Sequence, residues 1–97
     1  MKIIIETKRS ELDVMRRAGY GFLRQDAQSG EFSFVKRAGG SDYPRFHAYV
    51  KKEKGLLIVN MHLDQKRPSY EKSHAHNAEY DGKLIEDEMN AVKKAAV

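Results

Sequence analysis

The clearest folding signal in this sequence is the stretch Arg45–Asp64, RFHAYVKKEKGLLIVNMHLD. Two runs of strand-forming residues flank Lys54-Gly55, and a dipeptide of this kind is typical of a two-residue hairpin turn. With that turn, residues whose numbers sum to 109 face each other across two antiparallel strands. The stretch therefore predicts a hairpin in this register, or in one offset by two residues.

This register gives the hairpin an apolar face and a polar face. The apolar pairs are Phe46 with Leu63, Ala48 with Met61, and Val50 with Val59. The opposite face carries His47 with His62, Tyr49 with Asn60, Lys51 with Ile58 and, at its end, Asp64. Because strand side chains alternate, a slip of one residue would mix the two faces. We expect helices to cover the apolar face and any functional site to lie on the polar face.

Signals N-terminal to the hairpin predict one strand, one helix and a second hairpin. The isoleucine run at residues 2–6 favours a short strand. Ser10 suits the N-cap of a helix that ends near Gly19, with Asp13 placed as in a capping box. Strands near 20–26 and 31–37, joined by a turn at 27–30, place Phe32 and Phe34 on one face.

The C-terminal part predicts a long loop followed by a helix. Residues 65–81 show neither strand nor helix periodicity, and loops of this length are usually functional or disordered. Asp81 is placed to cap a helix over 82–96, whose apolar face holds Ile85, Met89, Val92 and Ala96. The order β-α-β-β-β-β-α predicts a single α+β domain over residues 1–97, with an antiparallel sheet and two helices packed on one face.

The composition narrows the possible chemistry. The chain has 97 residues, 40% of them hydrophobic, which suits one domain with a modest core. It contains no cysteine, so a metal would need His, Asp or Glu ligands. The start, MKIIIE, has only three consecutive apolar residues, too few for a signal peptide or a membrane span. We expect a soluble cytoplasmic protein.

The histidines suggest a divalent-metal site. All four lie between residues 47 and 76, and the loop begins directly after the polar end of the hairpin. If the loop folds back over the polar face, its side chains can join those of the strand. Imidazole and carboxylate groups suit zinc or manganese. The candidate metal ligands are His62, Asp64, His74, His76 and Glu79.

Two other interpretations of the same residues remain open. His47 and His62 face each other, so they can act as general base and general acid without a metal, with Lys66 and Arg67 holding a phosphate. This arrangement would suit RNA cleavage. Alternatively, the histidines are polar residues on a solvated sheet face, with Tyr70 and Tyr80 anchoring the loop.

The first half of the chain suggests a second class of function. Residues 1–55 carry 12 Lys/Arg against 7 Asp/Glu, and basic groups beside aromatic ones can hold RNA. The candidate RNA-binding residues are Arg16, Arg17, Arg24, Lys36 and Arg37. A protein-interaction module without a site of its own is the third possibility.

Two resemblances accompany these predictions. The layout of residues 10–37 resembles the opening of double-stranded-RNA-binding-like domains, including the HicA-type toxin ribonucleases, which implies RNA as a partner. That family carries a catalytic histidine in a Gly-Ser-His at the first turn, where this sequence has Gln28-Ser29-Gly30-Glu31. The pattern YPRFH…HLDQKRPSY…HAHNAEY is similar to small uncharacterised bacterial proteins and implies no particular activity.

Overall fold

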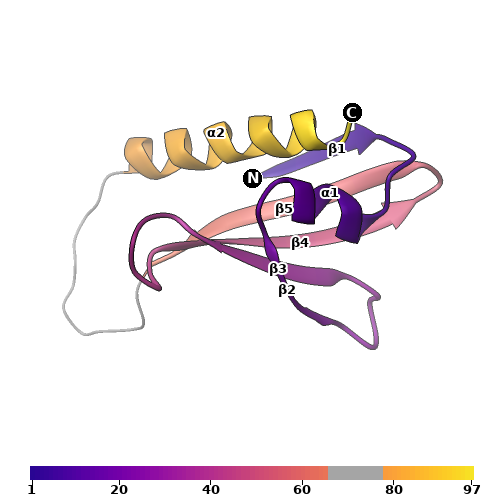
Figure 1. The fold of residues 1–97 in the computed structure, drawn as a ribbon, viewed down its shortest axis with the longest axis horizontal. Coiled ribbons are helices and arrows are strands. Elements are labelled where there is room, and N and C mark those ends of the chain that lie inside the picture. Colours follow the sequence, from indigo (N-terminus) through magenta and orange to yellow (C-terminus); the bar gives the residue numbers. More distant parts are fainter. Residues whose placement is uncertain (66–77) are drawn as a thin grey trace.

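The computed structural model describes residues 1–65 and 78–97, without the side chains of 78–81. Five strands form one antiparallel sheet in the order β1-β5-β4-β3-β2. The elements are β1 (Lys2–Glu6), α1 (Glu11–Arg17), β2 (Gly21–Gln25), β3 (Phe32–Arg37), β4 (Arg45–Glu53), β5 (Leu56–Asp64) and α2 (Ala78–Ala95). The predicted α+β class and element order are confirmed (Figure 1).

The central hairpin has the predicted register. β4 and β5 pair His47 with His62 and Ala48 with Met61, as the sum of 109 requires. Lys54 and Gly55 both have positive φ, 52° and 80°, as a two-residue turn of this type needs. The long β4 and β5 strands occupy the middle of the sheet, so their side chains meet neighbours on both sides.

The core lies between one face of the sheet and the two helices. The sheet contributes fully buried residues such as Phe34, Ala48 and Val59, and the helices contribute Val14 and Met89 among others. In Figure 1, α2 runs alongside β1 and β5, while α1 lies over the middle of the sheet. Both helices therefore cover the apolar face, and no helix of the described residues lies over the face that carries His47 and His62.

Local signals explain α1. The Ser10 side chain accepts a hydrogen bond from the Asp13 amide at 3.1 Å, which is the predicted N-cap contact. The Asp13 carboxylate is paired with Arg9 at 2.9 Å. Gly19 has a φ of 93°, a conformation that favours glycine where the chain leaves the helix.

One boundary differs from the prediction. The strands predicted near 20–26 and 31–37 are present as β2 and β3, with a register shift between Phe22 and Arg24 that makes Leu23 a bulge residue. The last helix begins at Ala78 and not near residue 82, which puts Asp81 inside the helix instead of at its cap. The helix therefore also takes in Glu79, which the prediction placed in the loop.

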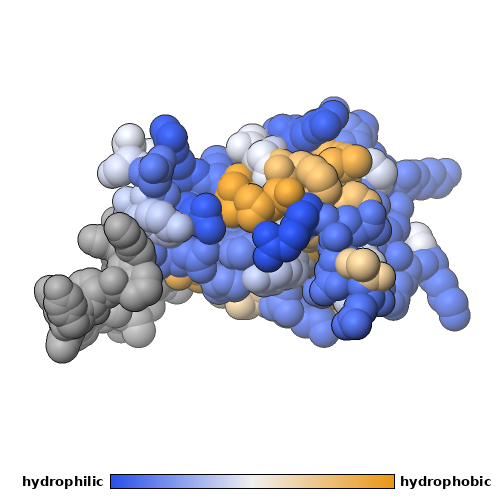
Figure 2. Space-filling view, turned by 90° about the horizontal axis from the view of Figure 1, so that it is seen from below, coloured by the Kyte–Doolittle hydropathy of each residue, from blue (hydrophilic) through white to orange (hydrophobic). Residues whose placement is uncertain are grey.

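β2 forms an exposed edge of the sheet. Phe22 and Leu23 are 47% and 38% exposed, although the Phe22 ring also lies 5.7 Å from that of Phe34. Figure 2 views the molecule from the side on which β2 lies in Figure 1, and it shows apolar side chains gathered in the middle of a hydrophilic surface.

Candidate metal centre

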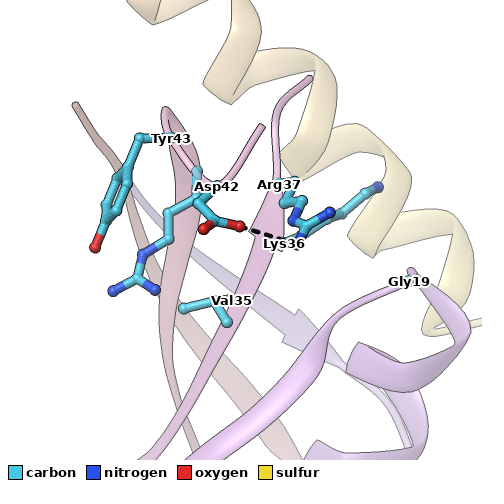
Figure 3. Close-up of a pocket in the computed structure, with 7 residues that line it drawn as sticks. Gly19, Val35, Lys36, Arg37, Asp42 and Tyr43 are labelled. Atoms are coloured by element: carbon cyan, nitrogen blue, oxygen red, sulfur yellow. Dashed lines mark ion pairs between the residues drawn. The ribbon is translucent and has the colours of Figure 1, made fainter. Parts of the chain in front are cut away.

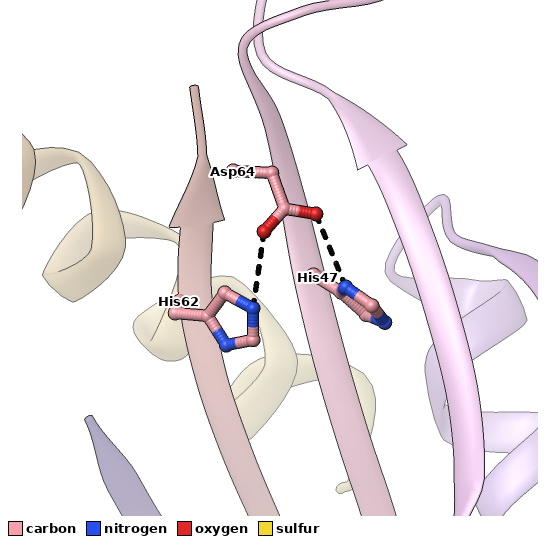
Figure 4. Close-up of side chains that lie close together, drawn as sticks. All are labelled: His47, His62 and Asp64. Atoms are coloured by element: carbon pink, nitrogen blue, oxygen red, sulfur yellow. Dashed lines mark hydrogen bonds and ion pairs between the residues drawn. The ribbon is translucent and has the colours of Figure 1, made fainter. Parts of the chain in front are cut away.

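His47, His62 and Asp64 converge on the sheet face that the helices leave open. His47 comes from β4, and His62 lies directly opposite it on β5. Asp64 follows His62 by two residues on the same strand, so both side chains point to the same side of the sheet. Figure 4 shows the Asp64 carboxylate pointing toward both imidazole rings.

The Asp64 carboxylate bridges the two histidines. Its Oδ2 atom lies 3.1 Å from His47 Nδ1, and its Oδ1 atom lies 3.1 Å from His62 Nε2. One ligand atom from each of the three residues lies within 4.8 Å of the others. The ring centroids of the two histidines are 5.1 Å apart, a separation that the strand pairing imposes.

The second nitrogen of His47 is held from the other side. His47 Nε2 lies 2.9 Å from the hydroxyl oxygen of Ser33, which is 4% exposed on β3. Tyr49 also packs against the His47 ring, with centroids 4.6 Å apart. His47 is itself only 8% exposed, so both ring orientation and solvent access are restricted. Hydrogen bonding of the distal nitrogen is how proteins orient histidine ligands.

The surroundings favour a neutral His47. Burial lowers the pKa of His47 below its ordinary value, and the nearby His62 ring and Arg45 guanidinium act in the same direction. The hydrogen bond and the negative charge of Asp64 oppose this shift. At neutral pH the ring is therefore uncharged, which is the form that binds a metal ion. Arg45 also contacts Asp64, with Nε to Oδ2 at 3.4 Å.

Two imidazoles and one carboxylate can bind a cation from one side. Such a set resembles the two-histidine, one-carboxylate arrangement that leaves coordination positions open for water or a ligand.

Ser33, His47 and Asp64 also form a hydrogen-bonded row like that of a serine nucleophile with its base. The burial of Ser33 makes it a poor nucleophile, because a substrate carbonyl would have to reach a hydroxyl that neighbouring side chains cover.

The structure places only some of the predicted metal ligands. His62 and Asp64 lie together, and His47, which the sequence proposed as an acid–base residue, joins them. His74 and His76 lie outside the described residues, and so does the side chain of Glu79. These three residues stay predictions.

Sequence reasoning missed Ser33 and Arg45, which contact the cluster. Ser33 lies between Phe32 and Phe34, so alternation places it on the open face, but only the pairing of β3 with β4 brings it beside His47. Arg45 begins β4 directly opposite Asp64. The predicted register already implied this pair, because the two residue numbers sum to 109.

Arg17 and Lys36, two of the five basic residues proposed for RNA, already have partners within the protein. Arg17 donates to the backbone oxygen of Ala95 at 3.0 Å, and Lys36 is paired with Glu88 at 3.1 Å. Arg37 lies at the end of β3, whereas Arg16 and Arg24 are exposed on α1 and β2. RNA binding and the resemblance to the HicA-type layout stay predictions.

No family model, curated protein or solved structure matches this chain. Among the described residues, neither helix is both long and apolar enough to cross a membrane.

Proposed function

We propose that this protein binds a divalent metal ion through His47, His62 and Asp64. The observation that carries this proposal is the convergence of three ligand atoms within 4.8 Å on one sheet face. The ligands come from two paired strands, so their spacing is set by the rigid centre of the sheet. The mixture of nitrogen and oxygen donors suits zinc or manganese.

Metal binding in this cluster is coupled to proton movement. The two nitrogens that face Asp64, His47 Nδ1 and His62 Nε2, are the ones that would face the ion. A nitrogen that binds a metal carries no proton, so the ion replaces the hydrogen bonds that these rings make to the carboxylate. His47 then holds its proton on Nε2, where the Ser33 hydroxyl oxygen accepts the hydrogen bond.

Melting curves with added zinc or manganese test the proposal. A ligand that binds only the folded state stabilises it by about 2.7 kcal/mol at a hundredfold excess over Kd. We expect the ion to raise the melting temperature of the wild type and EDTA to reverse the effect. The gain should shrink as the pH falls below about 6.5, the ordinary pKa of imidazole, because burial lowers the pKa of His47 and keeps this ligand neutral until the pH is below that value.

Single substitutions distinguish this site from adventitious binding. His62→Ala and Asp64→Asn each remove one ligand and should abolish most of the metal response. Asn60→Ala is the matched control, because Asn60 is exposed on the same strand and the same face. If His62→Ala and Asp64→Asn respond to metal as the wild type does, the proposed site is wrong.

The double variant His74→Ala/His76→Ala separates the strand ligands from the predicted loop ligands. The three strand residues should keep a measurable metal response in this variant. If the response is lost in the double variant and retained in His62→Ala, the site lies in the loop and the proposal for the sheet face is contradicted.

A further inference from the structure

A pocket of about 550 Å³ opens at the end of the sheet next to the metal centre. It is lined by the C-terminal half of β3, by Asp42 and Tyr43 from the connection to β4, and by Arg45 at the start of β4. Its volume is within the range of pockets that hold small ligands. Figure 3 shows Val35, Arg37, Asp42 and Tyr43 arranged around it.

Two arginines reach this pocket from neighbouring strands. Arg37 and Arg45 are directly paired across β3 and β4, so their Cα atoms face each other. The Arg45 guanidinium lies over the Tyr43 ring, 4.9 Å from its centroid, which restricts its position. Two arginines on paired strands can hold one anion between them, because guanidinium groups bind phosphate oxygens in bidentate fashion.

The present partners of these arginines are weakly bound. Arg37 pairs with Asp42 at 2.9 Å, but the two side chains are 64% and 78% exposed, and ion pairs in water contribute little. Arg45 reaches Asp64 only through a 3.4 Å contact of its Nε atom, and Asp64 is also shared with two histidines. An incoming dianion can therefore displace Asp42 from Arg37 at small cost, and it competes with Asp64 for Arg45.

The third cation of the pocket has another role. Lys36 Nζ donates to the Ala18 backbone oxygen at 3.1 Å and to Glu88 at 3.1 Å, both of which lie toward the helices. Tyr20 donates to the same Glu88 carboxylate at 2.9 Å. Lys36 thus ties the sheet to α1 and α2, and Arg37 and Arg45 are the anion-binding candidates.

We propose that this pocket binds a ligand carrying a phosphate group, held by Arg37 and Arg45. This proposal does not require the metal, because neither arginine is a metal ligand. It also differs from the RNA prediction, since it needs two particular arginines and not a basic surface.

Nuclear magnetic resonance titration of metal-free protein with phenyl phosphate and with inorganic phosphate tests the proposal. Backbone amide shifts should concentrate at residues 35–37 and at Asp42, Tyr43 and Arg45, and they should saturate. Loss of one charge-assisted contact weakens binding by about tenfold or more. We therefore expect Arg37→Gln and Arg45→Gln each to raise the dissociation constant by about this factor.

Lys54→Gln is the charge-matched control, because Lys54 lies in the turn at the other end of the β4–β5 hairpin. It should bind both phosphates as the wild type does. The proposal is overturned if the shifts fail to saturate, or if all three variants weaken binding equally, because either result indicates nonspecific attraction to a basic protein. It is also overturned if both arginine variants bind like the wild type.

Discussion

His47 is the residue on which the candidate metal centre most depends, because its two ring nitrogens have different partners. Nδ1 faces Asp64 at 3.1 Å, and Nε2 faces the Ser33 hydroxyl at 2.9 Å. A hydroxyl can donate or accept, so Ser33 can serve either tautomer of the ring. In the metal-bound protein it would accept from Nε2, which leaves the Nδ1 lone pair for the ion.

Substituting Ser33 tests this orienting role. Ser33→Ala removes the partner of a buried nitrogen, and loss of such an outer contact typically lowers metal affinity by about 10- to 100-fold. Calorimetric titration with zinc gives the affinity. The ¹⁵N shifts of the His47 ring in the metal-bound protein report which nitrogen holds the ion, and without Ser33 a second set of signals from a flipped ring bound through Nε2 should appear.

Ser41→Ala is the control for that experiment, since Ser41 is exposed and lies outside the strands. It should bind zinc as the wild type does. If Ser33→Ala keeps both wild-type affinity and wild-type ring shifts, Ser33 only fills space within the sheet.

At the scale of elements, alternation within the central hairpin made the register predictable. Phe46, Ala48 and Val50 require the same face as Val59 and Met61, and only registers of one parity satisfy this. That register also placed His47 opposite His62. The sequence therefore predicted that two of the three candidate ligands lie opposite each other. The structure adds that the third, Asp64, bridges them.

The other elements lack such a constraint. Phe22 and Leu23 are adjacent apolar residues on an edge strand, so alternation alone cannot assign faces, and the structure resolves the conflict with a bulge. The start of α2 was misplaced because Asp81 resembles a cap and Gly82 is a poor helix former. The Ser33–His47 contact depends on β3 pairing with β4 across a connection that carries no register signal.

The hairpin turn gives a stability prediction at this scale. Gly55 has a φ of 80°, where a Cβ atom costs roughly 1–2 kcal/mol. Gly55→Ala should therefore lower the free energy of unfolding by about 1 kcal/mol, although nothing within 4 Å would touch the added carbon. Urea denaturation measures the change.

Gly39→Ala is a matched control, because the added carbon there also meets nothing within 4 Å and φ is not in the left-handed region. Its free energy of unfolding should stay close to the wild-type value. Equal effects of the two substitutions would mean that the turn conformation is not what makes Gly55 important.

At the scale of the whole molecule, the two proposed sites share one residue. Arg45 lines the pocket and also contacts the Asp64 carboxylate at 3.4 Å. Its positive charge opposes a cation at the metal centre, whereas a phosphate in the pocket would neutralise that charge. Conversely, an ion bound to Asp64 weakens the attraction between Asp64 and Arg45 and leaves the guanidinium free for an anion. The two ligands should therefore favour each other's binding.

This coupling is reciprocal and can be measured from either side. If one ligand raises the affinity for the other by some factor, linkage requires the same factor in the reverse direction. We expect an increase of about fivefold or more, at the lower end of typical coupling between sites. Manganese titrations with and without saturating phenyl phosphate give one value, and phenyl phosphate titrations with and without manganese give the other.

Arg45→Gln should bring both factors close to one, because it removes the charge that the sites share. If the factor persists in Arg45→Gln, the phosphate contacts the metal directly and Arg45 does not couple the sites. A factor of one in the wild type would show that the pocket and the metal centre act independently.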